Sequence, residues 1–143
     1  MLHLAGIGGN EYTAVRTISG ELDISFHFLT KIFQHLTRSG LVDSYRGPNG
    51  GIRLSGDANE ISVRDIIVAL EGDKMFTECV LGLPGCEESH PCPLHSHWAK
   101  VRQEVETMLG SKSLKDIGED LRSGGYRLKA GAVWEAIAGT TEA

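Results

Sequence analysis

The fold of this chain is decided by residues 25–54, which read SFHFLTKIFQHLTRSGLVDSYRGPNGGIRL. Ser25 is a good helix N-cap, and Gly40 is placed to end the same helix. Between them, apolar residues recur at the spacing of one helix face, at Phe28, Leu29, Ile32, Phe33 and Leu36. The first half of the stretch therefore predicts an amphipathic helix that runs to about Ser39.

The second half of the stretch predicts a β-hairpin. Residues 41–45 and 51–54 read as two short strands, and residues 46–50 between them are Arg-Gly-Pro-Asn-Gly. Glycine, proline and asparagine supply the backbone angles that a tight hairpin turn requires. We expect this hairpin to form the wing of a winged helix-turn-helix module.

A further helix is predicted immediately upstream, over residues 12–22. Val15, Ile18 and Leu22 would share one face of it, and Thr13 would cap its first turn. A short break then leads into the next helix. Two helices joined by a short turn are typical of the helix-turn-helix.

Downstream signals predict three more helices. Ser62 with Asp65 forms a capping box for a helix that ends at Gly72, and Ser113 with Asp116 forms another. A long amphipathic helix between them is marked by Trp98, Val101, Val105, Met108 and Leu109. Its apolar face would pack on the same helix of a second subunit or on the chain's own wing domain, and we favour the homodimer.

These elements define the expected fold class, which is mainly α with a small β-hairpin wing. It comprises a winged helix-turn-helix domain plus a long dimerisation helix. Residues 1–72 would form the DNA-binding domain, 73–97 a loop bearing cysteines and histidines, 98–122 the dimerisation helices, and 123–143 a tail that we leave unassigned.

The charge distribution favours a nucleic-acid partner, although the net charge does not. The chain carries a net charge of −5, which argues against contacts to phosphate. From residue 25 to residue 55, however, Asp43 stands against four cations, which are Lys31, Arg38, Arg46 and Arg53. This local balance of +3 predicts a DNA-binding surface, and the alternative is that the four cations only solvate one face.

The expected DNA contacts lie at the start of the helix 25–39 and at the tip of the hairpin. A recognition helix points its first residues at base edges in the major groove, and here these are Ser25, His27, Thr30 and Lys31. Arg46 would enter the minor groove, and the backbone amides of Asn49 and Gly50 would meet phosphate. Four apolar residues of the helix are assigned to the core, namely Phe28, Leu29, Ile32 and Phe33.

All three cysteines lie in one short segment. Six residues separate Cys79 from Cys86, five separate Cys86 from Cys92, and His95 follows three positions later. Thiolate and imidazole are ligands that zinc and iron–sulfur clusters prefer. Because the sequence shows neither a signal peptide nor a long apolar run, we expect a cytoplasmic protein with no membrane contact, where such cysteines are metal or redox ligands.

The ligand pattern alone leaves several functions open. His90 and His97 are rivals of His95 for the fourth position. The set could hold zinc in a structural or RNA-binding module, act without metal as a thiol switch, or serve a thiol enzyme. No oxyanion site or orienting acid is recognisable, so we expect no enzyme, no catalytic residues and no small-molecule substrate.

Three phrases of the sequence resemble the IscR/NsrR-type, or Rrf-type, winged-helix transcriptional regulators of bacteria, namely residues 24–36, 39–54 and 61–72. The resemblance extends roughly from Tyr12 to Ile117. Its most specific part is the wing phrase S-x-R-G-P-x-G-G at residues 44–51. It implies a homodimeric repressor or activator that binds a palindromic operator in double-stranded DNA.

The ending Cys92-Pro-Leu-His95 is similar to the iron–sulfur cluster regulator of that family, in which three cysteines and a histidine hold a 2Fe–2S cluster. This similarity implies Cys79, Cys86, Cys92 and His95 as cluster ligands. The stimulus would be iron–sulfur, redox or nitric oxide status.

Two features depart from the family pattern. Most of the first helix expected for the family is missing, either because the start codon is misassigned or because the protein has lost it. In addition, six residues separate the first two cysteines, one more than the five expected. Nitric-oxide-sensing relatives carry a 4Fe–4S cluster whose fourth ligand can come from the N-terminal helix. The retained histidine and the short start favour 2Fe–2S, with 4Fe–4S as the alternative.

Overall fold

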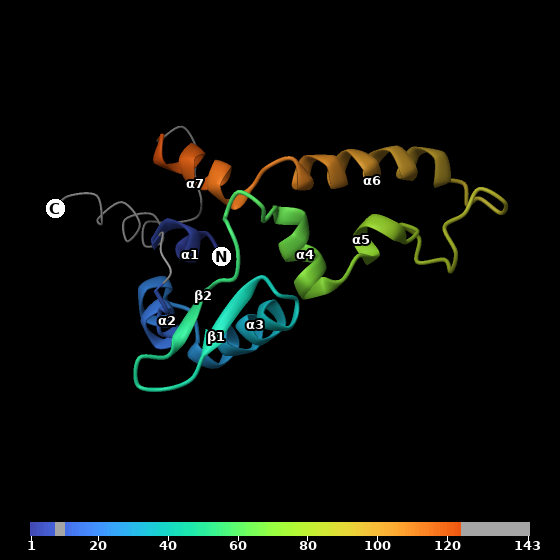
Figure 1. Cartoon of the computed structure of the whole chain (residues 1–143). Helices are drawn as coiled ribbons and strands as arrows, with labels where there is room; N and C mark the ends of the chain where they lie inside the picture. Colours follow the sequence, from blue (N-terminus) through green and yellow to red (C-terminus); the bar gives the residue numbers. More distant parts are fainter. Residues whose placement is uncertain (8–10, 124–143) are drawn as a thin grey trace. The chain divides into compact units, whose positions relative to one another are not determined.

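The computed structural model describes residues 1–7 and 11–123 (Figure 1). The predicted tail, apart from Ser123, lies outside the described residues. The described elements are α1 (Leu2–Ile7), α2 (Val15–Leu22), α3 (Phe26–Arg38), β1 (Val42–Tyr45), β2 (Gly51–Leu54), α4 (Val63–Glu71), α5 (Lys74–Thr77), α6 (His95–Gly110) and α7 (Leu114–Arg122). The predicted class, mainly α with a two-stranded antiparallel hairpin, is confirmed.

The chain divides into two compact units. The first comprises residues 1–61 together with the segment from Ser113 onward, and the second comprises residues 62–112. The functional boundaries predicted after residues 72, 97 and 122 divide the chain differently, and they stay predictions.

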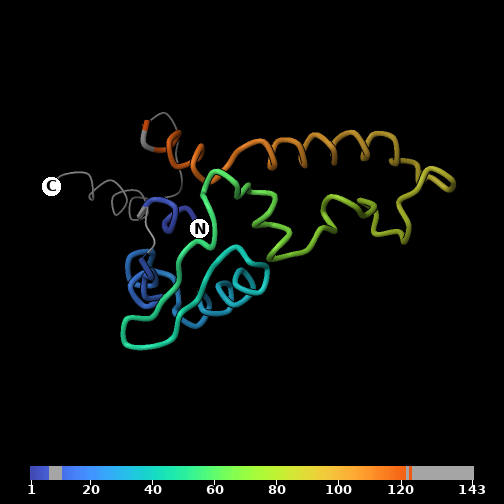
Figure 2. The backbone as a smooth tube through the Cα atoms, in the orientation of Figure 1, coloured from blue at the N-terminus to red at the C-terminus, as the bar shows by residue number. Residues whose placement is uncertain are grey.

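The first unit is built on α3. Its buried residues Leu29, Phe33 and Leu36 pack with Ile18 of α2 and with the inward-facing residues of the hairpin, Val42 and Ile52. Gly40 ends α3 as predicted, with a left-handed φ of 75°, and the next amide, that of Leu41, donates to the Leu36 carbonyl at 3.0 Å. Figure 2 shows the chain passing from α2 through α3 into the hairpin.

Two predictions about this unit were wrong. Thr13 does not cap α2, whose N-cap is Ala14. Thr13 instead forms an antiparallel bridge with Ile52 of β2, through two backbone hydrogen bonds of 2.9 Å. This bridge satisfies both the amide and the carbonyl of Thr13, which is why Thr13 lies beside the hairpin and not at the start of α2. Phe28 is not in the core but 58% exposed, since Leu29, Phe33 and Leu36 already fill the buried face of α3.

The wing is a regular hairpin in which Val42 pairs with Leu54 and Ser44 with Ile52. At its tip, the Gly50 amide donates to the Gly47 carbonyl at 2.9 Å, and Gly47 has a φ of 139°. Gly51 passes so close to the Thr13 backbone that a Cβ atom there would overlap the Thr13 carbonyl. The wing therefore needs a glycine at this position for packing rather than for an unusual backbone angle.

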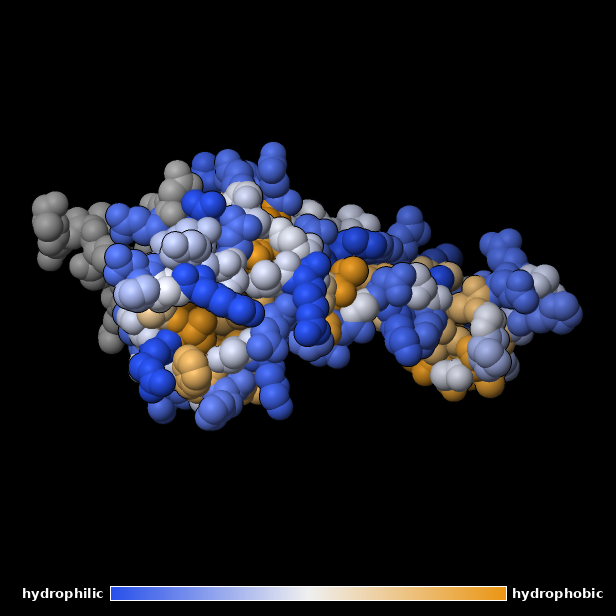
Figure 3. All heavy atoms as spheres, turned by 60° about the horizontal axis from the view of Figure 1, so that its bottom comes forward, coloured by the Kyte–Doolittle hydropathy of each residue, from blue (hydrophilic) through white to orange (hydrophobic). Residues whose placement is uncertain are grey.

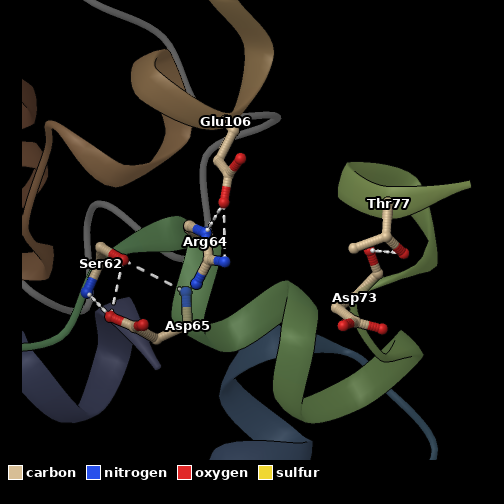
Figure 4. Close-up of polar contacts among 6 residues, drawn as sticks. All are labelled: Ser62, Arg64, Asp65, Asp73, Thr77 and Glu106. Atoms are coloured by element: carbon tan, nitrogen blue, oxygen red, sulfur yellow. Dashed lines mark hydrogen bonds and ion pairs between the residues drawn. The ribbon is translucent and has the colours of Figure 1, made fainter. Parts of the chain in front are cut away.

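The second unit contains α4, α5 and α6, with both shorter helices packed on α6. The predicted capping box at the start of α4 is present, because the Asp65 amide donates to Ser62 Oγ and the Ser62 amide donates to Asp65 Oδ2 (Figure 4). Arg64 of α4 pairs with Glu106 of α6, with Nη2 and Oε1 2.7 Å apart.

Two further helix boundaries are informative. Gly72 ends α4 as predicted, with a φ of 81°, and α5 follows directly. The sequence did not predict α5, whose turn is fastened by Thr77 Oγ1 donating to the Asp73 carbonyl at 3.2 Å. The capping box of Ser113 and Asp116 begins α7 as predicted. Within residues 1–7 and 11–123, no helix has the length and apolar character needed to cross a membrane.

The close approach at Gly51 yields a stability prediction. Gly51→Ala should lower the free energy of unfolding by about 1–3 kcal/mol, since the methyl group must displace the Thr13 backbone from β2. Gly56→Ala is the matched control, because a Cβ atom there has no neighbour within 4 Å. Urea unfolding followed by circular dichroism measures both, and equal stability of the two variants would contradict the packing described here.

A second stability prediction concerns His3, which is buried in the first unit. Burial lowers the pKa of His3, the Glu21 carboxylate 3.1 Å away raises it in part, and the chain's amino group lowers it. The folded protein therefore binds a proton at His3 less readily than the unfolded chain does, so its stability should fall as the pH drops below roughly 6.5.

Urea midpoints measured at about pH 7.5 and about pH 5.5, on either side of the ordinary histidine pKa, test this expectation. His3→Gln should flatten the pH dependence, whereas His35→Gln, which changes an exposed histidine, should keep it. The account fails if His3→Gln retains the full loss of stability at the lower pH.

Candidate metal centre and nucleic-acid interface

The three cysteines and His95 come together on one cavity of the second unit. The cavity has a volume of about 280 Å³ and lies within the segment from Cys79 to His95. Its lining comprises Cys79, Leu83, Pro84, Gly85, Cys86, His90, Pro91, Cys92 and His95. All four residues predicted as ligands from their spacing therefore face the same space.

The four candidate ligand atoms form two contacting pairs. Cys79 Sγ lies 3.6 Å from Cys92 Sγ, and Cys86 Sγ lies 3.5 Å from His95 Nδ1. A thiolate sulfur at about 2.3 Å from a tetrahedral metal lies about 3.5–3.8 Å from a second sulfur or an imidazole nitrogen bound to the same ion. Each pair thus has the separation of two ligands on one metal ion. Among the described residues, no three potential ligands are arranged around a single point as they would be on one ion. The case for a metal centre therefore depends on the two pairs and on the cavity that they share.

Cys79 differs in burial from the other two cysteines, which are half-buried. It is buried, and the backbone amide of Leu81 is the main cause that lowers its pKa, against burial, which raises it. Cys92, the Leu83 amide and Cys86 lower it further. Stabilisation of the thiolate favours the form of cysteine that binds metals.

The structure separates the three candidate histidines. His95 is the first residue of α6 and contacts Cys86. His90 also lines the cavity but is exposed and lies against Ser89 Oγ, 3.2 Å away. His97 is exposed and is not part of the cavity lining. His95 is therefore the histidine best placed to complete the set.

Two residues of α6 bind the start of this segment, a role that the sequence did not predict for either of them. Trp98 Nε1 donates to the Glu78 carbonyl at 2.9 Å. Arg102 Nη1 donates to the carbonyls of Thr77 and Glu78, at 3.0 and 3.2 Å, and lies 3.4 Å from Cys86 Sγ. Their spacing in the sequence could have indicated this role, since residues 95, 98 and 102 share one face of a helix.

The outer surface of the ligand segment is hydrophobic. Four of its aliphatic side chains are about half exposed, namely Val80, Leu81, Leu83 and Leu94. Figure 3 shows orange spheres at the right of the view, where this segment lies. The four candidate ligands are themselves buried or half-buried, and of these aliphatic residues Leu83 also lines their cavity.

The predicted DNA contacts lie on exposed parts of the first unit. Ser25, His27 and Lys31 are exposed, and the Ser25 side chain makes no capping hydrogen bond to α3. Thr30 is half-buried, and its hydroxyl donates to the Phe26 carbonyl at 2.7 Å. The first three side chains are thus free to face a ligand, whereas Thr30 can offer mainly its methyl group.

Arg46 and α3 face a common groove of about 340 Å³. Its lining comprises Val15, Thr30, Phe33, Gln34, Thr37, Arg38, Ser44, Arg46 and Ile52. Arg46 and Asn49 at the wing tip are exposed, but the Gly50 amide is engaged by the Gly47 carbonyl. Gly50 therefore shapes the tip, and the amide that we expected to meet phosphate is already bonded.

Sequence reasoning misjudged other residues of this surface. Exposed Phe28 precedes Lys31 by one turn of α3, a position from which a phenyl ring can touch a thymine methyl group. Arg53, counted above as a free cation, pairs with Asp43 at 3.1 Å and lies over the Tyr12 ring at 4.8 Å. Arg53 therefore braces the wing, and Arg38 joins Arg46 as a cation of the groove.

Comparison with protein-family models identifies the chain. Residues 1–120 match the model described as "Rrf2: Iron-dependent Transcriptional regulator". The chain belongs to the Rrf2 family. The resemblance noted in the sequence is thereby confirmed, and so is the absence of an enzymatic role, because the matched relatives of the Rrf2 protein are transcriptional regulators.

Curated relatives agree with this assignment. The Rrf2 protein is 34% identical to an HTH-type transcriptional regulator of Neisseria meningitidis, over 87% of this chain and 83% of the relative. It is 36% identical to the HTH-type transcriptional regulator IscR of Xenorhabdus nematophila, over 70% of this chain and 60% of the relative. The chain thus spans less than two thirds of that IscR.

Solved structures give the same fold. CymR of B. subtilis, titled the global cysteine regulator, matches with a TM-score of 0.69 and 28% identity, covering 83% of this chain and 87% of CymR. T. potens IscR matches with a TM-score of 0.68 and 26% identity, covering 90% of this chain and 84% of that chain. Regulators of the Rrf2 family bind DNA, so the exposed cations of the first unit have a partner of suitable charge.

The groove predicts the effect of removing its wing arginine. Arg46→Ala should weaken binding to a DNA fragment selected by the wild-type protein by about 1–3 kcal/mol. Lys115→Ala is the control, because it removes an exposed cation from α7 rather than from the groove. Gel-shift titration measures both affinities, and a loss of affinity in the control equal to that in Arg46→Ala would count against a specific role for the wing.

Proposed function

We propose that this Rrf2 protein is a homodimeric transcriptional regulator that senses iron–sulfur, redox or nitric oxide status through an iron–sulfur cluster. Cys79, Cys86, Cys92 and His95 would hold the cluster, and 2Fe–2S is the favoured type. The single observation that carries this proposal is the pairing of the four ligand atoms on one cavity, at 3.6 Å and 3.5 Å. A two-iron cluster needs two protein ligands on each iron, which two contacting pairs supply.

The chemistry of the ligands suits a sensor. A bound cluster supplies one-electron redox chemistry, and a neutral imidazole in place of a thiolate raises its reduction potential. The chain contributes a stabilised thiolate at Cys79 and a histidine fixed at the first turn of a helix. Cys86 and Cys92 are only half-buried, which would leave the site within reach of oxidants and nitric oxide.

DNA reading is assigned to α3 and the wing. Ser25, His27 and Lys31 would face base edges and phosphates in the major groove, with the methyl group of Thr30 beside them. Arg46 would enter the minor groove, with the Asn49 amide at the phosphate backbone and Gly50 shaping the turn. These assignments follow from exposure and charge on one surface of the first unit.

Dimerisation is assigned to α6. Val101 and Met108 are 46% and 60% exposed and lie seven residues apart, which places them on one face of the helix. Burial of such a face against the same helix of a second copy gives an isologous dimer. A dimer of this kind would present two recognition helices to half-sites roughly 34 Å apart, as a palindromic operator requires.

A thiol switch without a cluster is the second candidate. The Cys79 and Cys92 sulfurs, 3.6 Å apart, need to approach by only about 1.6 Å to form a disulfide. Structural relatives include CymR of Staphylococcus aureus in a form titled oxidized. Iron in the anaerobically purified protein would indicate the cluster, and its absence the thiol switch. Metal analysis would also detect zinc, which is colourless.

The ligand assignment predicts the behaviour of two histidine variants. Anaerobic reconstitution of the wild-type protein should give visible absorption with about two irons and two sulfides per chain. His95→Ala should lose most of that iron or shift its spectrum, because an alanine cannot bind metal. His97→Ala should match the wild type, since His97 does not line the cavity.

Several results would contradict the assignment. A wild-type protein without iron but with a reversible Cys79–Cys92 disulfide would establish the thiol switch instead. Zinc bound in equal amount to protein would indicate a structural site. About four irons per chain would identify the 4Fe–4S alternative.

A further inference from the structure

Arg102 joins two parts of the ligand segment that are distant in sequence. Its Nη1 atom reaches the Thr77 and Glu78 carbonyls, which precede the first cysteine, and Cys86 Sγ, which is the second. The side chain projects from the second turn of α6, one turn beyond Trp98, whose indole binds the same Glu78 carbonyl. One guanidinium therefore contacts both the backbone before the site and a ligand of the site.

The charge of Arg102 is not used elsewhere among residues 1–7 and 11–123. No carboxylate in this part of the chain pairs with it, and Glu106, one turn further along α6, is taken by Arg64 with an Nη2–Oε1 distance of 2.7 Å. The side chain is also half-buried, which strengthens its interaction with a negatively charged sulfur. An N–H donor, shared with the Thr77 and Glu78 carbonyls, and a positive charge that no carboxylate of the described residues neutralises are thus directed at Cys86.

We propose that Arg102 is a positioning residue that tunes the cluster and links it to α6, an inference that rests on the function proposed above. Its N–H group donates to the Cys86 sulfur, and its charge stabilises the more negative, reduced form of the cluster. Both effects raise the reduction potential, because hydrogen bonds to cluster sulfurs stabilise the added electron. The same contact fixes the backbone at residues 77 and 78 to the helix that carries His95.

This role predicts two consequences for the chain. The segment from residue 77 to residue 87 should be less well ordered without Arg102, even when no cluster is bound, because the contacts to both carbonyls are lost. With the cluster bound, its dissociation should become faster, since a hydrogen-bond partner of a ligand typically contributes roughly tenfold or more to metal retention.

Three variants test the proposal. Arg102→Gln removes the positive charge and replaces the guanidinium with a shorter side chain. Arg102→Lys keeps the charge but lacks the planar guanidinium with its several N–H donors. Lys100→Gln is the control, because it removes an exposed charge from the same helix. In the reconstituted protein, the midpoint potential is measured by spectroelectrochemistry and the rate of iron loss by transfer to a chelator. In the cluster-free protein, hydrogen exchange is measured over residues 77–87.

The expected result is a more negative potential and about tenfold faster iron loss in Arg102→Gln, with partial recovery in Arg102→Lys and wild-type values in Lys100→Gln. The cluster-free Arg102→Gln protein should also exchange faster at residues 77–87. A potential and an iron-loss rate equal to those of the wild type would overturn the tuning role.

The design separates this inference from the proposed function. If the wild type takes up no iron, the proposed function fails and the tuning role fails with it, whereas the exchange data still report whether Arg102 orders the segment. If the wild type binds its cluster and Arg102→Gln behaves like Lys100→Gln in all three measurements, only the inference about Arg102 is overturned.

Discussion

The contact between Cys86 Sγ and His95 Nδ1, at 3.5 Å, is the constraint on which the candidate metal centre depends. It brings a ligand from a glycine- and proline-rich segment to the first residue of α6. A segment with that composition has little structure of its own, so its ligands converge only where other groups hold it. Trp98 and Arg102 do this from the same face of α6, and Cys79 is fixed in turn by the amides of Leu81 and Leu83. The site is therefore a joint property of the segment and the helix.

The proposed sensing would follow from this arrangement. A cluster held by three segment residues and one helix residue would tie the segment to α6, and α6 also carries the exposed apolar face that is proposed to form the dimer. Within the first unit, α3 and the wing share a groove whose lining includes Thr30 and Arg46 together with the buried residues Phe33 and Ile52, so the surface proposed to bind DNA depends on the packing of these two residues. In each unit, buried residues thus position an exposed surface to which a binding role is proposed.

The sequence was sufficient wherever a signal is local. Capping boxes at Ser62 and Ser113, the helix-ending Gly40 and Gly72, and the hairpin turn were all predicted, because each depends on residues within a few positions of one another. Thr13, Phe28 and the Gly50 amide were misjudged because their environments are set by neighbours that a linear pattern does not reveal. The spacing of the cysteines predicted which residues share the cavity, but neither their pairing nor the contact from Arg102 could be derived from spacing alone.

The most direct test of the central claim is pulsed electron paramagnetic resonance on the anaerobically reconstituted protein after one-electron reduction. The account predicts the signal of a two-iron cluster with hyperfine coupling to one directly bound histidine nitrogen, and loss of that coupling in His95→Ala. A reduced cluster without a coupled ligand nitrogen, or with a nitrogen coupling that survives in His95→Ala, would contradict the pairing of Cys86 with His95 on which the account is built.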